Sequence, residues 1–117
     1  MQQPIPAPVT IRALVDTGAS CTCIDPSVLQ SLQLTPTGSA SVHTPSTGAT
    51  PAAADQYDVG LAIFAALNQV PLFLATVPVI AADLLQPQGI HALIGRDILS
   101  LCVLHDNGTT GTFTLAF

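Results

Sequence analysis

The chain of 117 residues contains no lysine, no glutamate and no tryptophan, and only 8% of its residues are charged. Its two basic residues are arginines and its seven acids are all aspartates, which gives a formal net charge of −5. Proteins that bind nucleic acids need clustered lysine and arginine to neutralise phosphates. The composition therefore argues against a nucleic-acid partner.

Cysteine is also scarce, with Cys21, Cys23 and Cys102 as the only three. An odd count without a signal peptide fits a reducing compartment, so we expect free, buried thiols and a cytoplasmic location. Cys21 and Cys23 could be part of a metal site with Cys102, but no further cysteine pair or spaced histidine completes one. We therefore expect neither a metal nor any other cofactor.

A long uncharged stretch, residues 59–82, raises the question of a membrane span, because its length would cross a bilayer. Asn68 and Gln69 interrupt it in the middle, and apolar residues alternate with other residues on both sides of this pair. A period of two is typical of β-strands and not of helices. We therefore predict a β-hairpin over residues 57–79 and no membrane partner.

The length of the chain is enough for one domain. We expect residues 1–8 to be a proline-rich, extended lead and residues 9–117 to be the folded part. Its apolar runs are short and turn signals recur about every ten residues, which predicts an all-β barrel or sandwich with one or two short helices. Hydrophobic residues make up 49% of the chain. So apolar a composition indicates that a second copy of the chain covers part of the surface.

Local signals place the individual elements. Residues 9–15 alternate as a strand, and Asp25 followed by Pro26 is typical of a helix start, with the aspartate as N-cap. Residues 35–54 are rich in Thr, Ser, Gly and Pro, which predicts a mobile loop or the tip of a hairpin. Residues 89–101 form an apolar strand pattern that a glycine breaks, followed by a short helical turn.

The chain closes with a predicted hairpin, whose second strand is residues 112–117. Asn107, Gly108 and Thr109 have the form of a glycosylation sequon, but Asn-Gly is also the usual pair of a type I′ turn, and we predict the turn.

Two motifs carry the chemistry. The run Ala-Leu-Val-Asp-Thr-Gly-Ala-Ser, residues 13–20, places an acid directly after a predicted strand. Such an aspartate can form a plain turn, or an anion or metal site, although no companion acids stand at the spacing that a metal loop needs. About eighty residues downstream follows Ala-Leu-Ile-Gly-Arg-Asp-Ile-Leu, residues 92–99. The two motifs, in this order and at this spacing, resemble those of the retroviral-type (retropepsin-like) aspartic proteases.

This resemblance, which covers residues 9–117, implies a retropepsin-like acid-protease barrel and an aspartic endopeptidase that acts on peptides or proteins. It implies Asp16 as the catalytic acid, Thr17 as a hydrogen-bond partner of the facing loop, and Gly18 as an N–H donor to a carboxylate. Two such carboxylates share one proton: the ionised one takes a proton from water while the protonated one donates to the substrate carbonyl. The chain has a single Asp-Thr-Gly, so the second aspartate must come from the other subunit of a homodimer.

The resemblance also implies roles for residues around the acid. Those expected to contact substrate are Ala19, Ser20 and, in a flap over the site, Thr47 and Gly48. Those expected to support the catalytic loop from behind are Leu93, Ile94, Gly95, Arg96 and Asp97. The closing strand, residues 112–117, is expected at or near the dimer interface.

The match to the family has departures. Viral relatives often carry an acid where this chain has Ser20, and that acid pairs with the arginine of the second motif. The partner of Arg96 therefore stays open between Asp25, Asp97 and a carbonyl. The alternative to a protease is a retropepsin-like dimerisation or peptide-binding module that does not cleave.

The three histidines give no support to another kind of catalysis. None has a serine or cysteine partner in the arrangement of an activated nucleophile. We therefore expect His43 to be solvated in the flap, His91 to be packed, and His105 to neighbour a turn.

Overall fold

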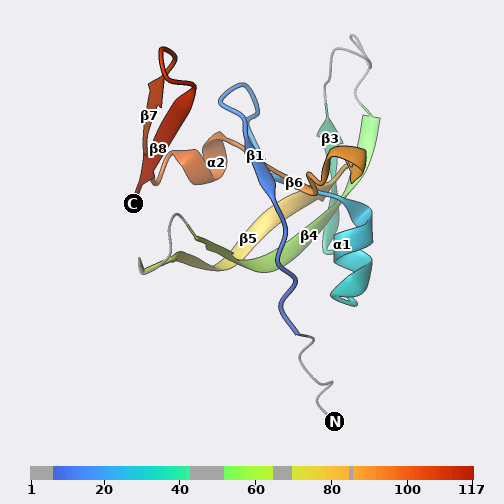
Figure 1. The fold of residues 1–117 in the computed structure, drawn as a ribbon. Coiled ribbons are helices and arrows are strands. Elements are labelled where there is room, and N and C mark those ends of the chain that lie inside the picture. Colours follow the sequence, from blue (N-terminus) through green and yellow to red (C-terminus); the bar gives the residue numbers. More distant parts are fainter. Residues whose placement is uncertain (1–6, 43–51, 65–69, 85) are drawn as a thin grey trace.

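The structure, a computed structural model, describes residues 7–42, 52–64, 70–84 and 86–117 (Figure 1). In chain order the described elements are β1 (Ala13–Val15), β2 (Cys23–Ile24), α1 (Pro26–Ser31), β3 (Gly38–Val42), β4 (Ala52–Ile63), β5 (Leu72–Ala81), the 3-10 helix η1 (Gln86–Gln88), β6 (Ala92–Ile94), α2 (Arg96–Leu99), β7 (Val103–Asn107) and β8 (Thr112–Ala116). Strands predominate and the helices are short, which confirms the all-β prediction. No helix within the described ranges is long and apolar enough to cross a membrane.

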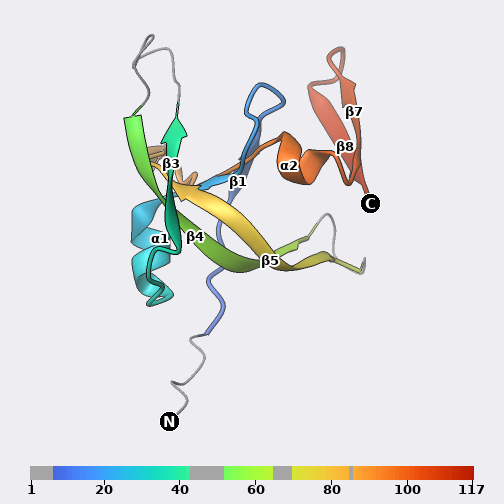
Figure 2. The ribbon, with the colours of Figure 1, turned by 180° about the vertical axis from the view of Figure 1, so that it is seen from behind.

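One curled sheet holds the two sequence motifs side by side. Its strand order is β1-β6-β2-β5-β4-β3, and it curves like half of a barrel (Figures 1 and 2). β6 runs parallel to β1, with Ala13 opposite Ala92 and Val15 opposite Ile94, and it runs antiparallel to β2. β6 therefore lies between the strand that enters the first motif and the strand that follows it.

The antiparallel pair β4–β5 confirms the hairpin predicted over residues 57–79. β3 also pairs antiparallel with β4, so the segment 35–54 contributes the two arms of a hairpin. The predicted tip of that hairpin, which includes His43, Thr47 and Gly48, lies outside the described residues.

β1 is shorter than the strand predicted over residues 9–15. It covers only Ala13–Val15, because its partner β6 is itself three residues long. Just before it, the Arg12 carbonyl accepts a hydrogen bond from the His91 N–H at 3.1 Å. His91 is half-buried here, directly before β6.

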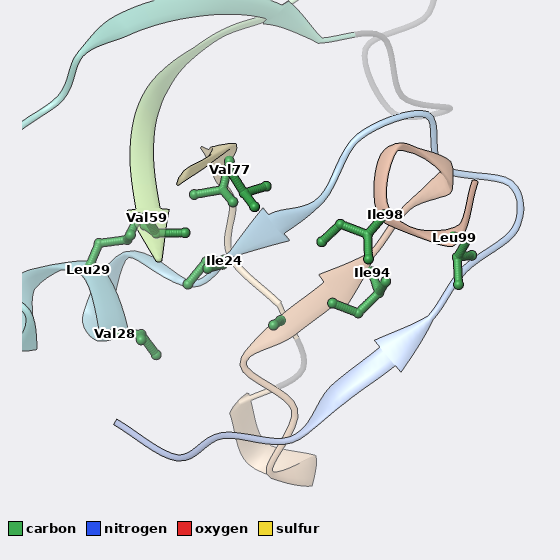
Figure 3. Close-up of a cluster of buried hydrophobic side chains, with 10 residues drawn as sticks. Ile24, Val28, Leu29, Val59, Val77, Ile94, Ile98 and Leu99 are labelled. Carbon is green, nitrogen blue, oxygen red and sulfur yellow. The ribbon is translucent and has the colours of Figure 1, made fainter. Parts of the chain in front are cut away.

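The hydrophobic core joins the sheet to both short helices. Its buried side chains come from β2, β4, β5, β6, α1 and α2: Ile24, Val28, Leu29, Val59, Val77, Val79, Ala92, Ile94, Ile98 and Leu99. Figure 3 shows Ile94 of β6 and Ile98 of α2 within this cluster. Burial of these side chains anchors both ends of the second motif, which fixes the position of the residues between them.

Asp25 caps α1 as predicted. Its carboxylate Oδ1 accepts hydrogen bonds from the Ser27 N–H at 2.9 Å and the Ser27 hydroxyl at 2.8 Å. Its Oδ2 accepts from the Leu84 N–H at 3.3 Å, which ties the segment after β5 to the helix start. The side chain is only 2% exposed, so these bonds form away from water.

We expect Asp25→Ala to lower the free energy of unfolding by about 1–2 kcal/mol, because it leaves backbone donors at a buried helix start without their acceptor. Urea denaturation of the two proteins measures the difference. Asp83→Ala, at an exposed aspartate after β5, is the control and should stay close to the native value. Equal losses in both variants would contradict the capping role.

The closing hairpin forms a separate two-stranded sheet, β7–β8, and here the turn prediction is wrong. Asn107 does not start a type I′ turn; it is the last residue of β7 and pairs with Thr112. Its side-chain oxygen accepts from the N–H groups of Thr109 and Thr110 at 3.2 and 3.3 Å, which favours a wider loop. Gly111, with φ of 70°, takes the left-handed position.

His105 is also placed differently from the prediction. It lies within β7, opposite Thr114 of β8, and is exposed, whereas the sequence predicted a neighbour of the turn. The wider loop explains this difference, because it moves the turn away from His105.

Candidate active site

The first motif forms a tight turn at the end of β1. The Asp16 N–H donates to the Ile94 carbonyl at 3.0 Å, which extends the pairing of β1 with β6. The chain then reverses, with the Ala19 N–H donating to the Asp16 carbonyl at 3.3 Å. The Gly18 N–H donates to Oδ1 of the Asp16 carboxylate at 2.9 Å. The carboxylate is thus held on a turn whose Thr17 and Gly18 are exposed.

The second motif passes directly beneath this turn. The Arg96 N–H donates to the Ala19 carbonyl at 2.8 Å. A Cβ added to Gly95 would lie 2.5 Å from the Cys21 carbonyl oxygen and 2.6 Å from its carbon, closer than side chains approach a backbone. Glycine is therefore required at this position by the close contact between the two motifs.

Thr22 links the two motifs through hydrogen bonds. Its hydroxyl donates to Asp97 Oδ1 at 2.8 Å, and its N–H donates to Asp97 Oδ2 at 3.0 Å. The same hydroxyl accepts from the Gly95 N–H at 3.2 Å. Thr22 is fully buried. We call this set, Thr22 with Gly95 and Asp97, the threonine clamp; it holds the far end of the Asp16 loop onto the start of α2.

The threonine clamp bears on the question of a partner for Arg96. The Asp97 carboxylate accepts from Thr22 and also from the Ile98 N–H at 2.8 Å, in the first turn of α2. The contact of Arg96 with the loop is made by its main-chain N–H and the Ala19 carbonyl, while the arginine itself is exposed. This is a bond of the main chain, so the partner of the Arg96 side chain stays a prediction.

Thr22→Val should lower the free energy of unfolding by about 2 kcal/mol, because valine keeps the shape of threonine but leaves the buried Gly95 N–H without its acceptor. Thr76→Val, at an exposed threonine on β5, is the matched control and should change stability by less than about 0.5 kcal/mol. Chemical denaturation of both variants measures the two free energies of unfolding. A Thr22 variant as stable as the control would mean that the threonine clamp does not stabilise the fold.

The remaining predicted residues fall into two groups. Ala19 is half-buried and Ser20 exposed, both on the Asp16 turn. Behind it, Leu93 is half-buried and Ile94 buried. The structure therefore brings Asp16–Ser20 together with the support residues of the second motif. Thr22 was missed by the sequence reasoning; the available signal was a polar residue between two cysteines on a segment entering the core.

Comparison with known families decides what this arrangement belongs to. A family model described as aspartyl protease matches residues 7–98, which contain the first motif, all but the last residue of the second, and the described six-stranded sheet. The chain belongs to the aspartyl protease family. Comparisons with curated proteins and with solved structures gave no significant match. The resemblance to retropepsin-like proteases is thereby confirmed at the level of the family.

The Asp16 turn of this aspartyl protease lies open on the single chain. Two hollows occur elsewhere on the surface. One of about 430 Å³ is lined by Val70 and by residues 114–117, from β8 and the residue after it, and one of about 220 Å³ lies between β5 and α2. Asp16 lines neither of them. Within the described ranges, no group of three or more His, Cys, Asp and Glu side chains is placed to hold a metal ion.

The three thiols of the protease are free, as predicted, but half-buried and not fully buried. Burial, together with Cys21 and the charges of Asp97 and Asp16, raises the pKa of the Cys23 thiol from 9.0 to about 11. The unfolded chain loses this proton near pH 9, whereas the folded chain holds it until about pH 11, so folding becomes less favourable as the pH rises through this window.

We therefore expect the free energy of unfolding to fall between pH 9 and about pH 11, and Cys23→Ser to show a smaller fall. Urea denaturation of both proteins at a series of pH values measures this difference. If the free energy of unfolding falls equally with pH in the native chain and in the variant, Cys23 is not the group that causes the fall.

Proposed function

We propose that this aspartyl protease is an endopeptidase that works as a homodimer, in which Asp16 of each copy supplies one member of a catalytic pair. The observation that carries the proposal is the Asp16 turn itself. Its carboxylate accepts the Gly18 N–H at 2.9 Å, and the Arg96 N–H and the threonine clamp support the turn from below. A binding module has no need for an acid held in this way on an exposed turn.

A second copy is required by the chemistry. Hydrolysis by this route needs two carboxylates close enough to share a proton. The chain contains one Asp-Thr-Gly, and the carboxylate of the nearby Asp97 is engaged by Thr22. A twofold axis next to the Asp16 turn would bring two Asp16 side chains together, with Thr17 of each copy bonding to the facing turn.

The proposed reaction follows from that pair. The ionised Asp16 accepts a proton from a water molecule, which attacks the carbonyl carbon of the peptide bond, while the protonated Asp16 of the other copy donates to the carbonyl oxygen. The tetrahedral diol then collapses: the protonated aspartic acid donates its proton to the leaving nitrogen, the C–N bond breaks, and the other aspartate takes a proton from a diol hydroxyl as the carbonyl re-forms. Neither step needs a cofactor, and the two aspartates end with one proton between them, as they began.

Exposed apolar side chains support the dimer. Those on or next to the closing hairpin are Leu101, Val103, Phe113 and Phe117, each at least 45% exposed. Apolar groups clustered at a surface usually mark a contact with another protein. We therefore place β7–β8 in or beside the dimer interface, with residues 9–117 as the working unit and 1–8 as a lead.

Substrate is proposed to cross the Asp16 turn, in contact with Ala19 and Ser20. The C-terminal end of β3 and the N-terminal end of β4 lie toward the same end of the molecule as this turn (Figures 1 and 2). Thr47 and Gly48, in the segment between those ends, remain proposed substrate contacts.

The proposal is tested by incubating the native chain with casein at acidic and neutral pH, and by adding a statine-type peptide, which mimics the tetrahedral intermediate. We expect casein fragments, inhibition of their release, and a higher melting temperature with the mimic, because it binds the assembled site. A chain that leaves casein intact and whose melting temperature does not respond to saturating mimic would favour the module that does not cleave.

A further inference from the structure

Two thiols lie near each other directly behind the Asp16 turn. The Cys23 Sγ lies 3.9 Å from the Cys21 carbonyl oxygen, and the Cys21 side chain contributes to the raised pKa of the Cys23 thiol. Both side chains are half-buried, so small molecules can reach them, and neither is in a disulfide. The third thiol, Cys102, follows α2, and its Sγ is 3.6 Å from the Ile98 carbonyl oxygen.

The backbone between the two thiols is part of the support of the site. Thr22, the residue between them, forms the threonine clamp with Gly95 and Asp97. The Cys21 carbonyl packs against Gly95 with no room for even one added carbon atom. Any movement of Cys21 toward Cys23 must therefore be passed on to the second motif.

We propose that Cys21 and Cys23 form an oxidation site, at which a hydroperoxide converts the two thiols into a disulfide that switches the peptidase off and that a thiol reductant reverses. The inhibitory part rests on the proposed function; the formation of the disulfide does not. The main chain bends at Cys21 and enters β2 at Cys23. Side chains two residues apart in an extended segment lie on the same face, so the two thiols share one side of this segment.

The chemistry balances with hydrogen peroxide as the oxidant. One sulfur, as thiolate, attacks a peroxide oxygen; the O–O bond breaks, hydroxide leaves and takes a proton to become water, and a sulfenic acid remains. The second sulfur attacks the sulfenic sulfur, the S–S bond forms, and a second water leaves. Two thiols lose two electrons and two protons, and one peroxide becomes two waters.

The two cysteines have different parts in this sequence. A thiol that stays protonated is a poor nucleophile, and the pKa of Cys23 is raised by burial to about 11. We therefore assign the first attack to Cys21 and the closing step to Cys23, whose Sγ lies 3.9 Å from the Cys21 carbonyl oxygen.

The structural consequence is a displaced threonine clamp. A disulfide holds its sulfurs about 2.0 Å apart, closer than any two sulfurs that are not bonded to each other. Drawing Cys21 toward Cys23 moves the Cys21 carbonyl against Gly95 and tilts Thr22, whose two bonds to Asp97 hold the loop in place. Because small misplacements of catalytic groups slow reactions steeply, we expect kcat/KM to fall by about tenfold or more.

To test the proposal, four proteins are treated with hydrogen peroxide: the native chain, Cys21→Ser, Cys23→Ser and the matched control Cys102→Ser. Intact mass, casein cleavage and amide hydrogen exchange are then measured for each. In the native chain and the Cys102 variant we expect the loss of two hydrogens, faster exchange of the Thr22 and Gly95 amides and loss of cleavage, all restored by dithiothreitol. The Cys21 and Cys23 variants should show no such loss of mass.

Oxygen addition without a disulfide, or a disulfide between two chains, would overturn the proposal. A disulfide that leaves both cleavage and the exchange of these amides unchanged would overturn the switch. If the untreated chain cleaves nothing, the proposed function fails, while mass and amide exchange still decide whether the disulfide forms and displaces the threonine clamp.

Discussion

Asp16→Asn is expected to abolish peptidase activity, lowering the rate of casein cleavage by on the order of a thousandfold or more. An asparagine keeps the oxygen that accepts the Gly18 N–H, so the turn should keep its shape. It cannot take a proton from water or share one with the facing aspartate. The measurement is the initial rate of casein cleavage at equal protein concentration, with the melting temperature as a check that the fold is retained.

Asp58→Asn is the matched control for this experiment. Asp58 is an exposed aspartate on β4, opposite Pro78, and its substitution removes the same charge without touching the Asp16 turn. Its activity should stay within about twofold of the native chain, as expected of a surface substitution. Equal cleavage by the native chain and the Asp16 variant would mean that Asp16 is not the catalytic acid.

Gly95→Ala is expected to have the largest effect on folding. The added methyl carbon would lie 2.5 Å from the Cys21 carbonyl oxygen, and the obstacle is backbone and not a movable side chain. The methyl group fits only if the two motifs move apart. This movement weakens both the threonine clamp and the hydrogen bond from the Arg96 N–H to the Ala19 carbonyl. We expect a loss of about 3 kcal/mol or more, which approaches the whole stability of a small domain.

Gly38→Ala is the matched control, because nothing lies within 4 Å of a Cβ added at Gly38 on β3. Urea denaturation should show the Gly38 variant near the native midpoint and the Gly95 variant far below it or unfolded. Similar midpoints for the two variants would show that the close approach of Cys21 and Gly95 is not maintained in the protein.

Much of the fold could be predicted because its signals are local. The N-cap at Asp25 followed by Pro26, and the alternation on both sides of the polar break in the long hairpin, each act over a few residues. The turn at Asn107 was predicted wrongly for a related reason. The Asn-Gly pair fits two kinds of loop, and the side-chain bonds of Asn107 to Thr109 and Thr110 favour the wider one.

The candidate site could be predicted only in part, because its support depends on contacts between distant residues. The acid and its glycine are neighbours and form a recognisable motif. The Thr22–Asp97 bonds, however, join residues 75 positions apart. The sequence around either residue does not indicate that the other is its hydrogen-bond partner. The requirement for glycine at position 95 likewise comes from the Cys21 backbone that packs against it.

The central claim, that two copies each supply one Asp16, is tested most directly by mixing subunits. A fixed amount of the native chain is equilibrated with a threefold excess of the Asp16→Asn chain, at concentrations where dimers form, and casein cleavage is measured. Random pairing leaves native dimers at about a quarter of their original number, so activity should fall to about a quarter. Unchanged activity would mean that one chain carries the whole catalytic apparatus, which contradicts the account.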